Sequence, residues 1–258
     1  MKKITSRDNA IYKDLHKLAA SARGRKKLGL SLLEGVHLIE MYQAQHGAPK
    51  TFVVSESGAK HAEIAALLKK SAAAEVLLLP DAMFTGISSV ETPAGILALV
   101  ETPRPKPAHD VDFCVLLEDI QDPGNLGSIL RSAAAAGVQH VFLSAHCAFP
   151  WSPKVIRAGM GAHFLLSVHE AADLLQIARN FKGTVLATSL AATQSIYQID
   201  LRGPLALIIG NEGAGLSDAL RLAATTQVWI PMPGEMESLN AAAAAAVCLF
   251  ERVRQTQV

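Results

Sequence analysis

The chain has 258 residues, of which 50% are apolar and only 5% are aromatic, so it is long enough for one large or two ordinary domains. Its formal net charge of +1 hides an asymmetry, because residues 1–30 contain nine Lys or Arg and only two acidic residues. This asymmetry predicts a basic arm that binds a polyanion. A solvated basic helix would explain the charge equally well.

Membrane, metal and disulfide chemistry are not expected. Cys114, Cys147 and Cys248 have neither metal nor redox spacing, which indicates reduced thiols and a cytoplasmic protein. The nine histidines form no metal-binding pattern, so no metal is expected. No apolar segment of a signal peptide follows the basic N-terminus, and the apolar run at 241–250 is too short to span a bilayer.

The N-terminal part predicts a small α/β domain. An amphipathic helix is expected over residues 9–22, with its basic residues mostly off the apolar stripe (Ile11, Leu15, Leu18, Ala19 and Ala22). Strands at 51–55, 76–80 and 95–101 alternate with a helix near 59–70 and a second, short helix. The segment "ETPRPKPAHD" (101–110) contains three prolines and indicates a linker. The predicted domains are 1–101 and 111–258, joined by residues 102–110.

The second part predicts a parallel α/β sheet. Its strands are continuous apolar runs, typical of a sheet covered on both faces, at 113–118, 140–144, 184–189, 205–210 and 227–232. A helix is expected at about 127–136. Another should begin with Ser152 as its N-cap and Pro153 at its first position.

Three polar loops follow strands of this sheet, where ligands of α/β proteins bind. The first, "DPGNLGSILRSAAAAG", contains Asn125 and Arg131, with Arg131 expected about one turn into the helix; a plain strand–turn–helix with a surface arginine is the structural alternative. The second, "IIGNEGAGLS", carries Glu212, which would repel a phosphate and suits a hydroxyl, an amine or a sulfonium. The third, "IPMPGEMESLN", precedes six alanines, and Ser238 there could act as a helix N-cap.

In this order and spacing the three motifs resemble those of the SpoU family of RNA 2′-O-ribose methyltransferases, in the SPOUT superfamily. The segment "SPKVIRAGMGA" is also similar to the family, and the catalytic resemblance covers about residues 110–255. The segments "LLEGVHLIE" (32–40) and "ETPAGILALVE" (91–101) are similar to the substrate-binding domain that often precedes it, a small ribosomal-protein-like RNA binder.

The resemblance implies the cofactor S-adenosylmethionine, a trefoil-knotted α/β catalytic domain, and a homodimer whose partner subunit completes the site. The implied reacting residues are Asn125, Arg131, Glu212, Ser238 and Asn240. The implied cofactor-binding residues are Gly210, Ile230, Met232 and Leu239, with Thr188 and Ser189 as further candidates at the end of another strand. The basic residues expected to bind RNA are Arg7, Lys13, Lys17, Arg23, Arg25, Lys26, Lys27 and Arg157.

The expected reaction is in-line methyl transfer to a ribose 2′-hydroxyl. Arginine is too basic to deprotonate readily, which favours Arg131 as a charge that holds a phosphate or lowers the pKa of the hydroxyl, although the family's arginine has also been considered a base. Ribosomal RNA is favoured over transfer RNA because the additional N-terminal domain is commoner among the family's ribosomal enzymes. The nucleotide, and the subunit that supplies Arg131, stay open.

Two alternatives belong to other functional classes. One is a non-catalytic RNA-binding or ribosome-assembly factor on the same scaffold; the intact Asn125, Arg131, Glu212 and Asn240 argue against it. The other is a dinucleotide-dependent oxidoreductase, which needs a GxGxxG turn after its first strand. The loop after "FCVLLE" reads "DIQDPGNLG", which also disfavours an ordinary Rossmann-type methyltransferase.

Overall fold

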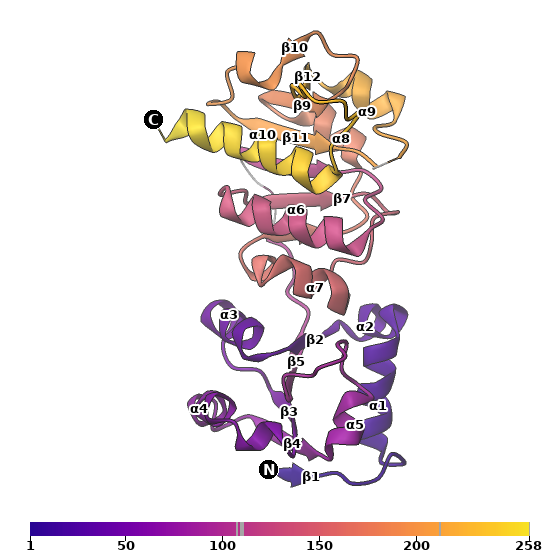
Figure 1. The fold of residues 1–258 in the computed structure, drawn as a ribbon, viewed down its shortest axis with the longest axis vertical. Coiled ribbons are helices and arrows are strands. Elements are labelled where there is room, and N and C mark those ends of the chain that lie inside the picture. Colours follow the sequence, from indigo (N-terminus) through magenta and orange to yellow (C-terminus); the bar gives the residue numbers. More distant parts are fainter. Residues whose placement is uncertain (107, 109–110, 212, 258) are drawn as a thin grey trace. The chain divides into compact units, whose positions relative to one another are not determined.

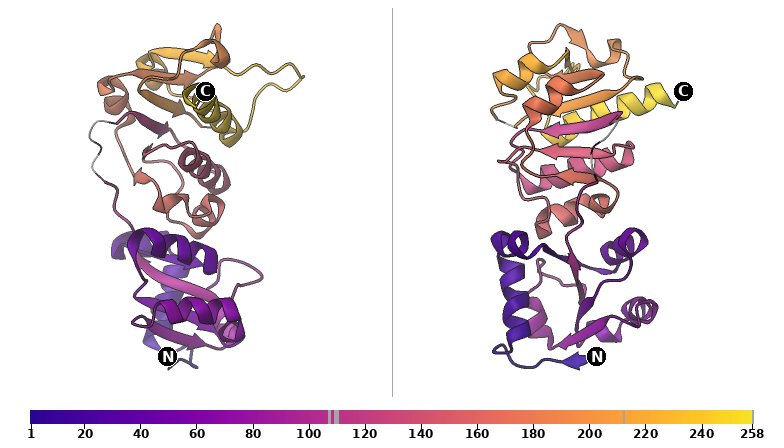
Figure 2. Two further views of the ribbon diagram at one scale, coloured as in Figure 1. Left: turned by 90° about the vertical axis from the view of Figure 1, so that its left-hand side faces the viewer. Right: turned by 180° about the vertical axis from the view of Figure 1, so that it is seen from behind.

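The computed structural model describes residues 1–106, 108, 111–211 and 213–257. It divides into two compact units (Figures 1 and 2). Unit 1 comprises Met1–Pro103 and Trp151–Phe164; unit 2 comprises Arg104–Pro150 and Leu165–Val258. The sequence-based boundaries assign residues 151–164 to the second domain, whereas in the structure helix α7 (Pro153–Gly159) packs on strand β2 of unit 1. In the part of the chain described, no helix is long and apolar enough to cross a membrane.

Unit 1 is a five-stranded mixed sheet in the order β1-β4-β3-β5-β2. Its strands are β1 (Lys2–Lys3), β2 (Leu30–Glu34), β3 (Thr51–Ser55), β4 (Glu75–Leu79) and β5 (Ile96–Glu101). Strand β5 runs antiparallel to both of its neighbours, and the other pairs are parallel. The helices are α1 (Ala10–Ala20), α2 (Ala22–Leu28), α3 (Val36–His46), α4 (Ala62–Lys70), α5 (Asp81–Thr85) and α7, with 3₁₀ turns η1 (Gly58–Lys60) and η2 (Ala162–Phe164). Figure 1 shows the sheet edge-on, with α3 and α4 on one side and α1 and α5 on the other.

The helix expected over residues 9–22 is two helices in the structure. Ser21 ends α1 in an extended conformation and its hydroxyl accepts from the Gly24 amide at 3.0 Å, which starts α2. Leu15 and Leu18 are buried in the core as predicted, whereas Ala22 is exposed at the start of the second helix.

Unit 2 is a seven-stranded sheet in the order β10-β12-β9-β11-β6-β7-β8, and all its strand pairs are parallel. The parallel sheet is confirmed. Its strands are β6 (Phe113–Leu117), β7 (His140–Leu143), β8 (Ser167–His169), β9 (Thr184–Thr188), β10 (Gln194–Ser195), β11 (Leu205–Ile209) and β12 (Thr226–Trp229). The helices are α6 (Pro123–Ala135), α8 (Leu174–Asn180), α9 (Asp218–Ala223) and α10 (Ala241–Thr256), with a 3₁₀ turn η3 (Ile196–Gln198).

Helices cover both faces of this sheet, as the continuous apolar strands predict. Helices α8 and α9 pack on one face, where Leu174 and Leu220 join a buried cluster with Leu116 and Ile208. Helices α6 and α10 lie side by side on the other face (Figure 1). Both faces of the sheet are therefore covered by helices, and the part of the sheet left uncovered is the edge at which the strands end in loops.

Candidate active site

The site lies at the carboxyl ends of four neighbouring parallel strands. Strands β12, β9, β11 and β6 are adjacent in that order and point the same way, so the loops that follow them meet at one edge of the sheet. Backbone hydrogen bonds continue past the ends of these strands: the Ser189 amide donates to the Val228 carbonyl, and the Glu118 amide donates to the Ile209 carbonyl, both at 2.9 Å. All three motif loops of the sequence start on this edge.

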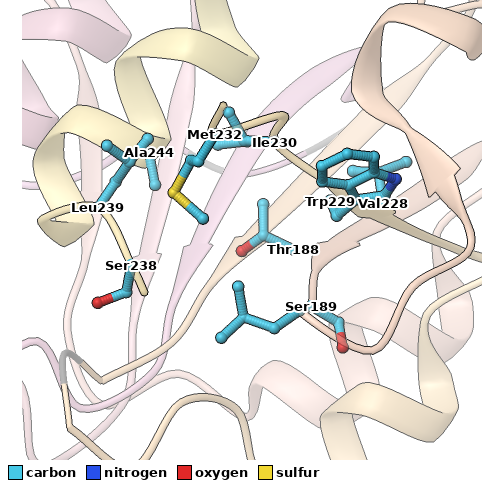
Figure 3. Close-up of a pocket in the computed structure, with 10 residues that line it drawn as sticks. Thr188, Ser189, Val228, Trp229, Ile230, Met232, Ser238, Leu239 and Ala244 are labelled. Atoms are coloured by element: carbon cyan, nitrogen blue, oxygen red, sulfur yellow. The ribbon is translucent and has the colours of Figure 1, made fainter. Parts of the chain in front are cut away.

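A cavity of about 150 Å³ opens between the ends of β9 and β12 and the start of α10 (Figure 3). Its lining is mostly apolar with three hydroxyl groups, and comprises Thr188, Ser189, Leu190, Val228, Trp229, Ile230, Met232, Ser238, Leu239 and Ala244. Five of the six residues predicted to bind a cofactor are among them; the sixth, Gly210, is not. Leu190, Val228, Trp229 and Ala244 were not predicted, although Leu190 directly follows Ser189 and Trp229 directly precedes Ile230.

Asn240 connects two of the motifs. Its side-chain oxygen accepts from the Ala242 and Ala243 amides at 2.9 and 3.4 Å, so Asn240 is the N-cap of α10. The idea that Ser238 provides this cap is therefore wrong: Ser238 lies two residues earlier, exposed, in the lining of the cavity. The Asn240 amide group also donates to the Asn125 side-chain oxygen at 2.8 Å. This bond joins the first motif to the third, 115 residues apart in the chain.

The first motif begins its helix earlier than expected. Asp122 caps α6 by accepting from the Asn125 amide at 2.8 Å, and Pro123 occupies the first turn, so the helix starts four residues before 127. Arg131 is consequently more than two turns into α6, about 12 Å along the axis from its first residue, rather than one turn. The Arg131 side chain is exposed, does not line the cavity, and has no hydrogen bond or ion pair to the rest of the described chain.

The second motif forms a tight loop closed by Asn211. The side-chain oxygen of Asn211 accepts from the Gly213 and Ala214 amides, both at 2.9 Å, and its amide group donates to the Asp119 carbonyl at 2.9 Å. Gly210 is required here for space, since a Cβ on it would lie 2.5 Å from the Gly215 carbonyl oxygen. Glu212, predicted as a reacting residue, lies outside the described residues.

The alanine run forms the first turns of α10. Ala241 and Ala245, one turn apart, are buried where α10 packs on α6, while Ala244 lines the cavity and Ala243 is exposed. Small side chains therefore allow close packing of α10 on α6 and leave open space beside Leu239. Larger side chains would be excluded at the buried Ala241 and Ala245 and not at the exposed Ala243.

Most of the basic residues predicted to bind RNA are exposed. These are Arg7, Lys13, Lys17, Arg23, Lys26, Lys27 and Arg157. Arg25 is a correction: it is only 5% exposed, and its guanidinium donates to the Leu18 and Ala19 carbonyls at the end of α1. Burial lowers its pKa, and it ties α2 to α1 instead of facing solvent. Lys13 also pairs with Asp8 at 2.9 Å.

None of the three cysteines lines this cavity. Burial raises the pKa of the Cys114 and Cys248 thiols to about 12, and that of Cys147 also lies above its ordinary value, mainly through burial. Within residues 1–106, 108, 111–211 and 213–257 no group of three or more His, Cys, Asp or Glu could hold a metal ion.

Comparison with known families assigns both parts of the chain. A profile described as the SpoU rRNA Methylase family matches residues 112–250, more than half of the sequence. The chain belongs to the SpoU rRNA methylase family. A second profile, the MRM3-like substrate binding domain, matches residues 9–98, so this SpoU methylase carries the N-terminal domain that its sequence resembles. The predicted family is confirmed.

Two relatives and one solved structure cover nearly the whole SpoU chain. It is 33% identical over 272 residues to the 23S rRNA (uridine(2479)-2′-O)-methyltransferase of Streptomyces viridochromogenes, covering 98% of this chain and 92% of the relative. It is 31% identical over 253 residues to the 23S rRNA (guanosine(2553)-2′-O)-methyltransferase of Bacillus subtilis, covering 97% and 98%. The AdoMet-bound rRNA methyltransferase from Sinorhizobium meliloti superposes with a TM-score of 0.83 at 30% identity, covering 98% and 97%. The predicted α/β fold is confirmed by this likeness.

Proposed function

We propose that this SpoU methylase transfers a methyl group from S-adenosylmethionine to a ribose 2′-hydroxyl of ribosomal RNA. The observation that carries the proposal is the cavity at the ends of β9 and β12, where three residues of the third motif meet Thr188 and Ser189 close to the start of α10, which the Asn125–Asn240 bond joins to α6. Relatives that span almost the whole chain act on 23S rRNA at uridine or guanosine, so ribosomal RNA is favoured over transfer RNA. The two relatives differ in the target base, and the base for this chain is left open.

The cavity residues fit the cofactor chemically. Apolar side chains of Ile230, Met232 and Leu239 offer a surface for a flat ring, and the hydroxyls of Thr188 and Ser189 offer hydrogen bonds to a polar edge (Figure 3). Gly210 would contribute to the cofactor site indirectly, because it allows the tight turn of the second motif, whose loop lies beside the cavity. When bound, S-adenosylmethionine supplies an electrophilic methyl group.

Arg131 is assigned to the RNA. An exposed guanidinium without a partner in the described chain is available to hold a phosphate next to the reacting ribose, or to lower the pKa of its hydroxyl. Because Arg131 does not line the cavity of its own chain, we propose that a homodimer brings it to the cavity of the partner subunit. The Asn125–Asn240 bond would hold α6 and the start of α10 in register for that contact.

The N-terminal unit is proposed to grip the RNA backbone with its exposed Lys and Arg residues. Deleting residues 1–30 would remove β1, α1 and buried Leu15 and Leu18, so neutralising exposed side chains is the cleaner perturbation. Each lost contact with a phosphate of a single-stranded RNA segment lowers the slope of log affinity against log salt concentration by about 0.7. The double variant Arg23→Gln with Lys27→Gln should therefore weaken RNA binding and flatten its salt dependence, without changing cofactor affinity.

The cellular location and the knot of the chain are proposed from the family resemblance. We propose a cytoplasmic enzyme whose C-terminal segment is knotted. The proposed knot is supported by the path of the chain, which leaves β12 near one end of the sheet and returns across the loop edge to α10 beside α6. Side-chain bonds from Arg252 to the Leu201 and Gly203 carbonyls fasten α10 to the segment before β11.

The proposal is tested by methyl transfer from S-adenosylmethionine to ribosomal RNA with the Arg131→Ala variant. Removing an electrostatic contact of the reacting group is expected to lower turnover about 100-fold or more, with the calorimetric affinity for the cofactor unchanged. Arg179→Ala is the matched control and should retain full turnover. Arg179 is an exposed arginine on α8, which covers the face of the sheet opposite α6. Near-normal turnover of Arg131→Ala rejects the assignment of this residue. Wild-type protein that binds RNA but no cofactor would instead favour the non-catalytic assembly factor.

A further inference from the structure

Trp229 is an unusual residue at the rim of the cavity. It is the last residue of β12, and its side chain is 37% exposed, while the preceding Val228 is fully buried. The alternation along the strand places the two side chains on opposite faces. In Figure 3 the indole of Trp229 and the thioether of Met232 lie on opposite sides of Thr188. The indole therefore forms one wall of the cavity.

The indole has no partner in the described part of the chain. No aromatic ring or cation stacks on it, and its N–H group makes no hydrogen bond to a described residue. The other tryptophan of the chain, Trp151, is only 3% exposed and packs beside His163 with ring centroids 5.2 Å apart. A large aromatic surface that is partly exposed beside a cavity is available to a ligand.

We propose that Trp229 stacks on the adenine of the cofactor and acts as a positioning residue for it. The inference rests on the proposed function, and it adds a residue outside the Ile-Pro-Met and Ser-Leu-Asn motifs. A purine presents a flat π-face, and tryptophan offers the largest aromatic face of any side chain. Thr188, the last residue of β9, and Ser189, which follows it, also line the cavity and offer hydroxyl groups to the polar edge of the ring. The methionine part of the cofactor then extends toward Ser238 and Leu239, where Asn240 and Asn125 meet.

The chain contains only two tryptophans, so fluorescence can test the contact directly. In the Trp151→Phe variant the emission reports on Trp229 alone. It is titrated with S-adenosylhomocysteine, adenosine and methionine, and calorimetry on the same variant and on the wild type gives the affinities. We expect saturable changes of emission with S-adenosylhomocysteine and with adenosine, at the concentrations at which calorimetry detects binding, and no change with methionine.

Substitutions at Trp229 separate stacking from bulk. Trp229→Ala is expected to weaken S-adenosylhomocysteine binding about tenfold, which is about 1.4 kcal/mol and lies within the range for one base stacked on an aromatic side chain. Trp229→Phe, which keeps a ring, should stay within about threefold of the wild type. Melting curves of both variants verify that unit 2 is folded, and the Trp151→Phe titration does not depend on either of them.

Two results would overturn the inference while leaving the proposed function intact. The first is calorimetric binding of S-adenosylhomocysteine with unchanged Trp229 emission. The second is a folded Trp229→Ala variant with wild-type affinity. A response to methionine but not to adenosine would also overturn it, because the indole would then face the other end of the ligand. Absence of any binding to the wild type would reject the proposed function itself.

Discussion

Replacing Asn240 tests how the motifs are held together, because one side chain performs two tasks. Its oxygen caps α10 through the Ala242 and Ala243 amides, and its amide group donates to Asn125 at 2.8 Å. Asn240→Ala removes both interactions. Asn240→Asp retains the cap, since aspartate is as good an N-cap as asparagine, and removes only the donor to Asn125.

The two variants should differ measurably in the free energy of unfolding. Loss of an N-cap costs about 1 kcal/mol, and loss of a solvent-accessible hydrogen bond costs about 0.5 kcal/mol or slightly more, so Asn240→Ala should lose about 1.5 kcal/mol. In Asn240→Asp the lost bond is offset by a negative charge at a helix N-terminus, worth about 0.3–1 kcal/mol. Its stability should therefore be close to that of the parent protein.

The assay is urea unfolding in the Trp151→Phe background, where Trp229 fluorescence reports on unit 2 alone. A lower midpoint at unchanged slope for Asn240→Ala, with little change for Asn240→Asp, is the expected result. Equal shifts of the midpoint for Asn240→Ala and Asn240→Asp would show that the N-cap contributes nothing to the stability of unit 2, contrary to this prediction. An unchanged midpoint for both would mean that neither interaction stabilises unit 2.

Two further perturbations test the loop edge and the far side of the same sheet. Gly210→Ala should destabilise unit 2 by about 1–3 kcal/mol, because the new Cβ would meet a backbone oxygen at 2.5 Å; Gly213→Ala, whose Cβ would lie 3.6 Å from its nearest neighbour, is the control and should change stability little. His140 and His169 share a ring hydrogen bond of 3.0 Å, and burial lowers both pKa values, so below about pH 6.5 the unfolded chain binds protons that the folded unit resists. The melting temperature of the wild type should thus fall when the pH is lowered from 7.5 to 5.5. The fall should be smaller in His169→Gln, and as large as in the wild type in the control His146→Gln, which changes an exposed histidine. A fall in His169→Gln as large as in the wild type would exclude this pair as the cause.

Local sequence signals predict much of unit 2. Continuous apolar runs identify β6, β7, β9, β11 and β12 to within one to three residues, because strands buried on both faces have few polar positions. Ser152 and Pro153 start α7 as predicted, since capping depends on neighbouring backbone groups only. The third motif and the end of β9 supply five of the residues predicted to bind the cofactor to one cavity, whereas Gly210 and Arg131 do not line it.

The structure differs from the sequence-based predictions where contacts between distant parts of the chain determine the local conformation. Strands β1, β8 and β10 have only two or three residues each and form by pairing with distant strands. They are too short for a pattern of apolar residues to predict them. Arg25 is charged and was expected on the surface, but the end of α1 at Ala20 presents carbonyls that its guanidinium satisfies. Asn240 caps α10 in place of Ser238, which a serine-based capping rule does not anticipate.

The proposed methyl transfer can be measured by nucleoside mass spectrometry of ribosomal RNA incubated with the protein and S-adenosylmethionine carrying a deuterated methyl group. One ribose-methylated nucleoside with the label on the 2′-oxygen is expected, formed by the wild type and by Arg179→Ala but not by Arg131→Ala. Label on a base, or equal labelling by Arg131→Ala, would contradict this expectation.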